Sequence, residues 1–286
     1  MLPQRVASAV VGVPVIIGII LLGGIGYSVA LAFVLAVAAL EFFAFLISPD
    51  SEPTTSPRPL ASPLSALERL LGQRPLGYIG AAFVALLVAA AHNGADWWTG
   101  ALALAVAVTF LWLIWQGDTA SGLRDWLTVV TGIVYIGFLG SHLVFLRALE
   151  GGRDWTLIAV FATFAADSAA YFVGHAFGRT KLAPRISPGK TVEGSIGGLL
   201  SGALAVLLLN WALDAGMDMG EAVPLALLLP IAATVGDLGE SLMKRGAGVK
   251  DASAIVPGHG GFLDRLDSLL LSTVLVYYYL IWVVLP

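Results

Sequence analysis

The chain has 286 residues, of which 58% are hydrophobic and only 12% are charged, and its formal net charge is −4. Soluble domains carry about 25% charged residues, so this composition excludes a soluble globular protein and indicates an integral membrane protein. There is no cysteine, which excludes disulfides and thiolate metal sites.

Runs of about 20 apolar residues are long enough to cross the roughly 30 Å of hydrocarbon in a bilayer. By this measure the sequence predicts an all-α, polytopic membrane protein with about nine transmembrane helices. The first run is interpreted as a span rather than a signal peptide, because no small-residue cleavage pattern follows it. The expected spans are residues 6–22, 27–47, 75–91, 97–115, 126–146, 155–177, 194–213, 222–242 and 266–285.

The spans fall into two predicted regions. Residues 1–150 hold spans one to five, together with a flexible cytoplasmic loop at 48–74 that is rich in proline and serine. A segment of that composition buries too little apolar surface to fold by itself. Residues 151–286 hold spans six to nine and form the predicted catalytic region, with cytoplasmic loops at 178–193 and 243–265.

Lysine and arginine are distributed unevenly between the two sides that nine spans imply. Thirteen lie on the side of the N-terminus and two on the other, so the positive-inside rule places the N-terminus in the cytoplasm. All four lysines lie in the loops at 178–193 and 243–265. That concentration favours an anionic ligand such as a cytosolic phosphate. Lysines that only fix the topology or touch anionic headgroups would give the same pattern.

Several carboxylates lie inside the predicted spans. Asp167 is in the middle of the sixth span, and Asp237 and Glu240 are near the end of the eighth. A carboxylate at a helix centre costs about 2.5–3.5 kcal/mol, so these residues should face a bundle interior, a cavity or a partner. Asp237 and Glu240 share a helical face with Lys244, although Glu240 and Lys244 would also fit a simple ion pair. Glu41, in the second span, is expected to be a buried partner for a cation.

Two further carboxylates, Asp264 and Asp267, open the last span. In a first helical turn they would interact favourably with the helix dipole. Together with Asp237 they would instead supply oxygen ligands for Mg²⁺. The turn before them contains His259, a candidate phosphate ligand or base or simply a turn residue, and Gly260–Gly261, which would let the backbone approach a bound phosphate.

The loop at 178–193 leads into the seventh span. Gly189–Lys190–Thr191 is similar to the end of a P-loop, but Pro184 occupies the position of the required first glycine, so a P-loop is excluded. Ser187–Pro188 instead predicts a helix start, whose free N–H groups would, with Lys190, suit an anion. The glycines that follow recur at four-residue intervals, which predicts a close helix–helix face. They are Gly194, Gly198 and Gly202.

Two long motifs occupy the second half of the chain. The stretch from Ser241 to Asp267 has the pattern S-x-hydrophobic-K-R-x₄-K-D followed by H-G-G-x-x-D-R-x-D. The stretch from Asp167 to Gly198 has D-x-x-A-Y-x-x-G-x-x-x-G followed by S-P-x-K-T-x-E-G. Both patterns resemble the motifs of the phosphatidate cytidylyltransferase (CDP-diacylglycerol synthase) family. The resemblance covers residues 167–267, whereas the first 150 residues are similar mainly in hydrophobic character.

The resemblance implies an enzyme that transfers CMP from CTP to phosphatidic acid, giving CDP-diacylglycerol and pyrophosphate, with Mg²⁺ as cofactor. From their positions, Asp237 and Asp264 are expected to ligate the metal. The residues expected to act in catalysis are Asp237, Asp264, Lys250, Asp267 and His259. The residues expected to bind CTP or phosphatidate are Asp167, Ser187, Lys190, Thr191, Glu193, Ser241, Lys244, Arg245, Asp251 and Arg265.

The resemblance also suggests a homodimer in the cell (inner) membrane, with cytoplasmic active-site loops and no nucleic-acid partner. The glycine faces would permit such a dimer. Two alternatives stay open: another CTP-dependent lipid enzyme (a polyprenol kinase or a cytidylyltransferase for a different lipid phosphate), and an ion-coupled transporter. A kinase would release CDP instead of pyrophosphate, and a transporter would leave the lysine-rich loops unexplained.

Overall fold

The computed structural model describes residues 2–47, 68, 70–253, 255 and 260–285. Most of these residues are helical, and the two strands found among them are short, which confirms the all-α fold class. The chain divides into two compact units. Unit 1 comprises Met1–Val144 and Lys244–Arg265, and unit 2 comprises Phe145–Met243 and Leu266–Pro286.

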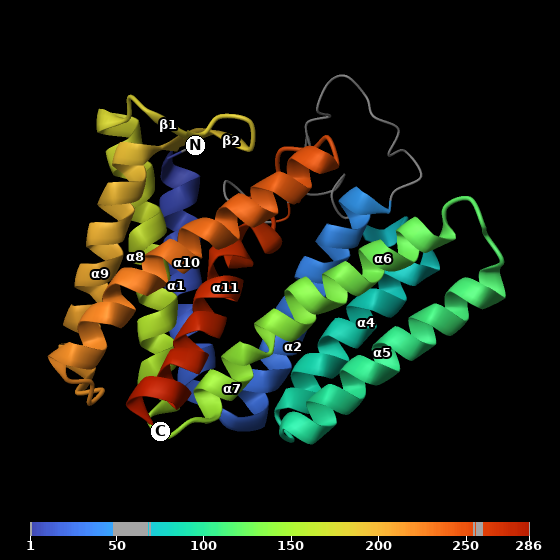
Figure 1. Ribbon diagram of the computed structural model, residues 1–286, viewed down its shortest axis with the longest axis horizontal. Helices are drawn as coiled ribbons and strands as arrows, with labels where there is room; N and C mark the ends of the chain where they lie inside the picture. Colours follow the sequence, from blue (N-terminus) through green and yellow to red (C-terminus); the bar gives the residue numbers. More distant parts are fainter. Residues whose placement is uncertain (1, 48–67, 69, 254, 256–259, 286) are drawn as a thin grey trace. The chain divides into compact units, whose positions relative to one another are not determined.

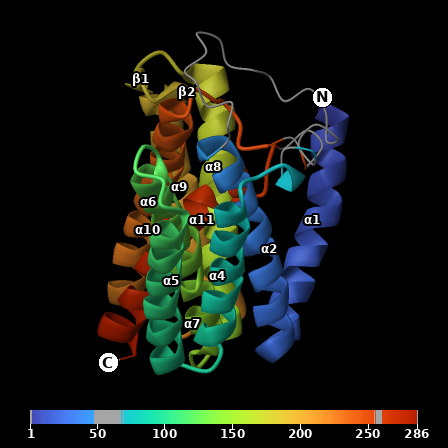
Figure 2. The same ribbon diagram turned by 90° about the vertical axis from the view of Figure 1, so that its right-hand side faces the viewer.

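Unit 1 is a group of apolar helices. They are α1 (Leu2–Leu22), α2 (Gly24–Leu46), α4 (Pro75–Ala91), α5 (Ala95–Gln116), α6 (Gly122–Gly132), the π-helical η1 (Ile133–Phe138) and the start of α7 (His142–Ala148). Helix α4 is central, because it packs against α2, α5 and α6. Figure 2 shows α4 and α5 lying side by side. Segments α6, η1 and α7 together form one candidate span.

Two aromatic residues near the end of α2 hold these helices together. Phe42 and Phe43 are completely buried. A Cβ atom at Gly80 of α4 would lie 2.7 Å from the ring of Phe43, and one at Gly132 of α6 would also collide with that ring. The two glycines therefore leave the space in which the ring packs. This packing fixes the end of α2 that carries Glu41.

Unit 2 holds four long helices and a small antiparallel sheet. Its elements are α8 (Gly152–Phe177), β1 (Lys181–Ala183), β2 (Ser187–Thr191), α9 (Val192–Leu213), α10 (Met219–Gly246), α11 (Leu263–Tyr279) and the π-helical η2 (Leu280–Val284). The last residues of α10 and the first of α11 belong to unit 1. Figure 1 shows the sheet at the end of the α8–α9 pair, between the two helices in the chain.

The predicted glycine face is confirmed and lies between α9 and α8. A Cβ atom at Gly194 would lie 2.6 Å from the carbonyl oxygen of Ala170, and one at Gly198 would lie 2.9 Å from that of Ala166. A Cβ atom at Gly202 would lie 3.0 Å from the Cβ of Ala166 and 2.6 Å from the ring of Pro230 in α10. Because this side of α9 is filled within the chain, these glycines are not available as the dimer face that they would have permitted.

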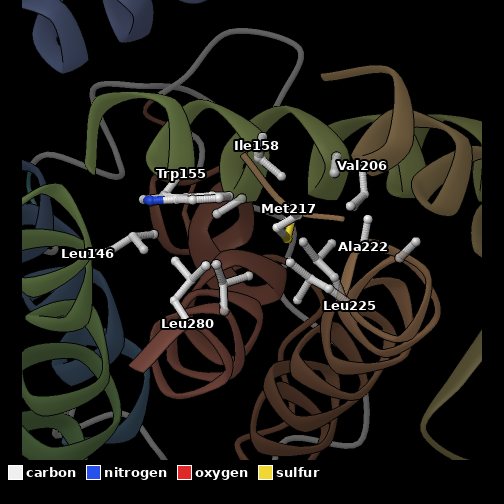
Figure 3. Packing of buried hydrophobic residues seen from close by; sticks show 13 residues of the cluster. Leu146, Trp155, Ile158, Val206, Met217, Ala222, Leu225 and Leu280 are labelled. Carbon is white, nitrogen blue, oxygen red and sulfur yellow. The ribbon is translucent and has the colours of Figure 1, made fainter. Parts of the chain in front are cut away.

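The core of unit 2 is a hydrophobic cluster contributed mainly by α8, α9, α10 and the end of the chain (Figure 3). Ile158 and Leu225 are completely buried in it. Trp155 packs its ring there while its indole N–H donates to a backbone carbonyl oxygen at 3.0 Å. A buried polar contact joins α8 to α11, with the hydroxyl oxygens of Thr163 and Ser272 2.9 Å apart.

Seven helical segments among the described residues are long and apolar enough to cross a membrane, which confirms a polytopic membrane protein. They are Gly24–Leu46, Ala95–Gln116, Gly122–Ala148, Gly152–Phe177, Val192–Leu213, Met219–Gly246 and Leu263–Val284. The expected number of nine is not confirmed. The helices at the first and third predicted positions, α1 and α4, are not among these seven, and α4 has only 17 residues.

The predicted flexible loop at 48–74 lies mostly outside the described residues, which omit 48–67 and 69. The functional division at residue 150 stays a prediction. The boundary between the compact units differs from this predicted division, since residues 244–265 are grouped with the N-terminal helices.

Candidate active site

The loop between α8 and α9 is a β-hairpin with a closed base. Strands β1 and β2 pair antiparallel, with Lys181 opposite Thr191. The carboxylate of Glu193, in the first turn of α9, accepts hydrogen bonds from the backbone N–H groups of Arg179 and Thr180, both at 3.1 Å. These bonds tie the residues that enter the hairpin to the residues that leave it. The side chains on the hairpin are therefore carried by an ordered platform.

The expected helix start at Ser187–Pro188 is wrong. Ser187 lies in β2, opposite Ala183, and α9 begins at Val192. Thr191 caps the helix, because its hydroxyl accepts a hydrogen bond from the N–H of Gly194 at 3.1 Å. Proline is common in the first turn of a helix, but it is also tolerated in an edge strand, and both strands of a two-stranded sheet are edge strands. The residue with the capping hydroxyl decides where the helix begins.

The hairpin presents Lys190 to α10. Its ammonium group lies 2.7 Å from a carboxylate oxygen of Asp237, and the two side chains are 21% and 32% exposed. The other oxygen of Asp237 accepts a long hydrogen bond, 3.4 Å, from the hydroxyl of Ser241 one turn further along α10. Three predicted site residues from two distant stretches of sequence are thus brought together in unit 2.

A fourth predicted residue of unit 2, Asp267, lies close to this group. A Cβ atom at Gly236, the residue before Asp237, would lie 2.5 Å from the backbone oxygen of Asp267. Helices α10 and α11 therefore approach each other closely here. Asp267 is buried, and its carboxylate accepts the backbone N–H of Ser268 at 2.7 Å.

Unit 1 contains a second lysine–aspartate pair. Lys244, at the end of α10, lies 2.6 Å from a carboxylate oxygen of Asp264 at the start of α11, and both side chains are at least nine-tenths buried. Asp264 also accepts the backbone N–H groups of Ala252, at 3.2 Å, and Gly261, at 2.7 Å. This carboxylate therefore binds groups from the end of α10, from the segment that follows it and from the turn before α11.

Glu41 is buried as expected, but its partners differ from the expectation. Its carboxylate accepts the hydroxyl of Ser253 at 2.6 Å and the backbone N–H groups of Phe262 and Leu263 at 3.1 and 2.8 Å. Within the described residues these donors are neutral, so the expected pairing with a cation is not what holds Glu41. The sequence signal was the isolated acid in an apolar span, and it did not reveal the partners.

The remaining predicted site residues take separate positions. Asp167 is half-buried near the middle of α8. Arg245 donates to the backbone oxygen of Val249 at 3.0 Å. The exposed ones are Lys250, Asp251 and Arg265. His259 lies outside the described residues.

The two predicted metal ligands differ in how well they suit Mg²⁺, which prefers carboxylate oxygens. Asp237 fits, because only one oxygen is engaged by an ammonium group and 32% of the side chain is exposed. Asp264 is already satisfied by Lys244 and two backbone N–H groups. Across the described residues, no group of three or more His, Asp or Glu side chains is placed to hold a metal. The two aspartates belong to different units, so their sharing of one ion stays a prediction.

The fold and these pairs define a helical integral membrane protein with lysine–aspartate pairs near the ends of its helices. Ammonium groups suit a phosphate, and a carboxylate oxygen that no ammonium group engages suits a divalent ion. A comparison with protein families then identifies the family. The model of the Cytidylyltransferase family matches residues 3–283, so this chain belongs to that family.

Several proteins named phosphatidate cytidylyltransferase are similar to this chain. The one from a Synechocystis species is 33% identical over 97% of this chain and 96% of its own length. The one from Staphylococcus haemolyticus is 27% identical over 92% of this chain and 93% of its own length. The one from Brucella suis is 43% identical over 54% of this chain and 56% of its own length. The family expected from the two sequence motifs is thereby confirmed.

Proposed function

We propose that this chain is a phosphatidate cytidylyltransferase. The observation that carries the proposal is its 33% identity to the Synechocystis protein of that name over 97% of the chain. In the reaction, a phosphate oxygen of phosphatidic acid attacks the α-phosphorus of CTP. The bond from that phosphorus to the bridging oxygen of the β-phosphate breaks, so the products are CDP-diacylglycerol and pyrophosphate.

The lysine–aspartate pairs suit this chemistry. Nucleotidyl transfer depends on positioning and on neutralising phosphate charge more than on covalent participation of the protein. Lys190 is carried on a hairpin whose base is closed by Glu193, so its ammonium group is placed before the substrate arrives. We assign Lys190 to the triphosphate of CTP, with Asp237 holding the lysine until then. Lys244, held by Asp264, is assigned to a phosphate in the same way.

The other predicted residues complete the proposed site. We assign Arg245 and Lys250 to the phosphates, with Ser187 and Thr191 nearby on the hairpin. The residues proposed to support or orient substrate are Asp167, Glu193, Ser241, Asp251, His259, Arg265 and Asp267.

Mg²⁺ is the proposed cofactor, with Asp237 as a ligand because it keeps an accessible oxygen. A bound Mg²⁺ would neutralise negative charge on the leaving pyrophosphate. Asp264 is the second proposed ligand, and it would have to exchange one of its present donors for the ion.

The decisive experiment is turnover by the purified protein with CTP labelled at the α-phosphorus, phosphatidic acid and Mg²⁺. Equal amounts of labelled CDP-lipid and pyrophosphate are expected. Release of CDP with a phosphorylated lipid would indicate a kinase. An absence of turnover with several lipid phosphates would favour transport. The Asp237→Asn variant, purified in the same way, controls for contaminating host enzyme.

We further propose that the N-terminus and the hairpin face the cytoplasm at the inner membrane, as the distribution of lysine and arginine supports. Because the chain has no cysteine, single cysteines at Arg185 and Asn93 report the orientation directly. An impermeant thiol reagent applied outside intact cells should label Asn93→Cys and spare Arg185→Cys. A homodimer is also proposed, on a surface other than the filled glycine face, and mass measurement in lipid nanodiscs tests it.

A further inference from the structure

We propose that Glu41, near the end of α2, is a positioning residue that fixes the segments carrying Asp264. The inference rests on the proposed function, because the role of Asp264 in the reaction gives the positioning its purpose. All the contacts involved lie within unit 1.

The first argument is the burial of a charged group. The side chain of Glu41 has no exposed surface, and a carboxylate in that position is strongly unfavourable unless donors surround it. Ser253 supplies a hydroxyl at 2.6 Å, and Phe262 and Leu263 supply backbone N–H groups at 3.1 and 2.8 Å. The partners are separated from Glu41 by 212 to 222 residues, so within unit 1 these bonds join residues far apart in the sequence.

The second argument is the helix that Glu41 caps. Helix α11 begins at Leu263, and the first N–H groups of a helix have no acceptor within it. Glu41 accepts two N–H groups at this end, from Phe262 and Leu263. A negative charge there is also favoured by the helix dipole. A side chain from α2 therefore holds the first residues of α11 within unit 1, and Asp264 is one of them.

The third argument is that two carboxylates hold the same two segments. Glu41 accepts from Ser253 and from Phe262 with a single oxygen. Asp264 accepts from Ala252 and Gly261, the residues immediately before these two; one of its oxygens accepts both N–H groups, and that of Ala252 is shared with the other oxygen. We call this arrangement the Glu41–Asp264 clamp.

Gly261 gives independent support. A Cβ atom at this position would lie 2.5 Å from a carboxylate oxygen of Glu41 and 2.8 Å from the hydroxyl oxygen of Ser253. Only glycine leaves room for the carboxylate to reach the start of α11. The sequence had suggested that Gly260–Gly261 admits a phosphate to the backbone, and here the second glycine admits Glu41.

In the Glu41–Asp264 clamp, the residue that positions the segments differs from the residue that pairs with the lysine. Lys244 pairs with Asp264, whereas the hydrogen bonds that Glu41 makes within the described residues go to Ser253, Phe262 and Leu263. Removing Glu41 leaves the lysine–aspartate pair chemically intact but loosens its support. A displacement of about 1 Å can lower a rate by about 100-fold, so the consequence should appear in kcat.

The test combines hydrogen–deuterium exchange with steady-state kinetics on the purified full chain. Glu41→Gln keeps the size of the side chain but turns an NH₂ group towards N–H donors. Glu41→Asp keeps the charge, and Ser253→Ala removes one of the three donors. Glu68→Gln, at an exposed glutamate, is the matched control. Exchange is measured in peptides that cover residues 260–270, and kinetics with CTP as the varied substrate.

Glu41→Gln should speed exchange at the start of α11 and lower kcat about 10- to 100-fold, with little change in the KM for CTP. Glu41→Asp should retain more activity than Glu41→Gln, Ser253→Ala should have a smaller effect, and Glu68→Gln should match the wild type. Unchanged exchange in Glu41→Gln overturns the proposal, whether or not kcat falls. Unchanged kcat in the folded protein overturns it as well. Faster exchange in a chain whose wild type makes no CDP-lipid leaves the clamp standing and rejects the proposed function instead.

Discussion

Alanine in place of Gly194 should destabilise unit 2 through the packing of α9 on α8. The new Cβ atom would lie 2.6 Å from the carbonyl oxygen of Ala170 and 3.0 Å from the Cα atom of Gly174. Both atoms belong to the backbone of α8, so the contact is relieved only if the helices move apart. Overpacking of this kind costs about 1–3 kcal/mol. For a chain of this size each kcal/mol lowers the melting temperature by roughly 2–4 °C.

The melting temperature in detergent, followed by tryptophan fluorescence, should therefore fall by roughly 2–12 °C. Gly100→Ala is the matched control, because Gly100 lies on the exposed side of α5 and its Cβ atom would meet nothing within 4 Å. Alanine there should leave stability unchanged or raise it by about 0.5–1 kcal/mol. If both variants melt at the same temperature as the wild type, α8 and α9 are not packed at the glycines as described.

Two further predictions concern the hairpin and the metal. Glu193→Gln should raise the KM for CTP several-fold with little effect on the melting temperature, because it weakens the hydrogen bonds to Arg179 and Thr180 that close the hairpin. An unchanged KM would contradict the assignment of Lys190 to CTP. Chelation with EDTA should abolish the formation of CDP-lipid and added Mg²⁺ should restore it, while full activity of the chelated, metal-free protein would refute the proposed cofactor.

The positions of the long helices could be predicted from the sequence because the membrane imposes a simple rule. A segment in hydrocarbon must satisfy its own backbone groups, so an apolar run of sufficient length becomes a helix. The expected span at 75–91 coincides with α4, and that at 194–213 differs from α9 only at its start. The number of spans was less predictable, because the first and third runs are close to the minimum length.

The hairpin could not be predicted in the same way. Its strands have three and five residues, and the second contains proline and glycine, which are both rare in strands. Its stability comes from neighbours instead: Thr191 packs against Gly174 of α8 and against Gly178, the residue that follows this helix, and Glu193 closes the base. Short-range sequence patterns do not contain these contacts.

The identities of the site residues could be predicted, but their pairings could not. An acid or a lysine in an apolar chain is conspicuous, so Lys190, Asp237, Lys244 and Asp264 were all expected. Which lysine meets which aspartate depends on how helices far apart in the sequence are packed. Glu41 illustrates this limit most clearly: a cation was expected as its partner, whereas in the structure it accepts hydrogen bonds from the start of α11.

The pair formed by Lys190 and Asp237 allows structural and catalytic roles to be separated. Both side chains are partly exposed, and an ion pair of this kind contributes about 1 kcal/mol or less to stability. Each single variant, Lys190→Met or Asp237→Asn, should therefore melt within a few degrees of the wild type.

If the two residues only neutralise each other, each single variant leaves one uncompensated charge and the double variant removes both. The double variant should then be more active than either single variant. If Lys190 instead binds the triphosphate and Asp237 a metal ion, each loss removes a separate source of charge stabilisation, which typically lowers kcat by about 100-fold or more. The double variant should then be no more active than the worse single variant. Recovery of activity in the double variant would show that the pair is only a structural contact. CTP would then have to be bound by Lys244 and the residues around it.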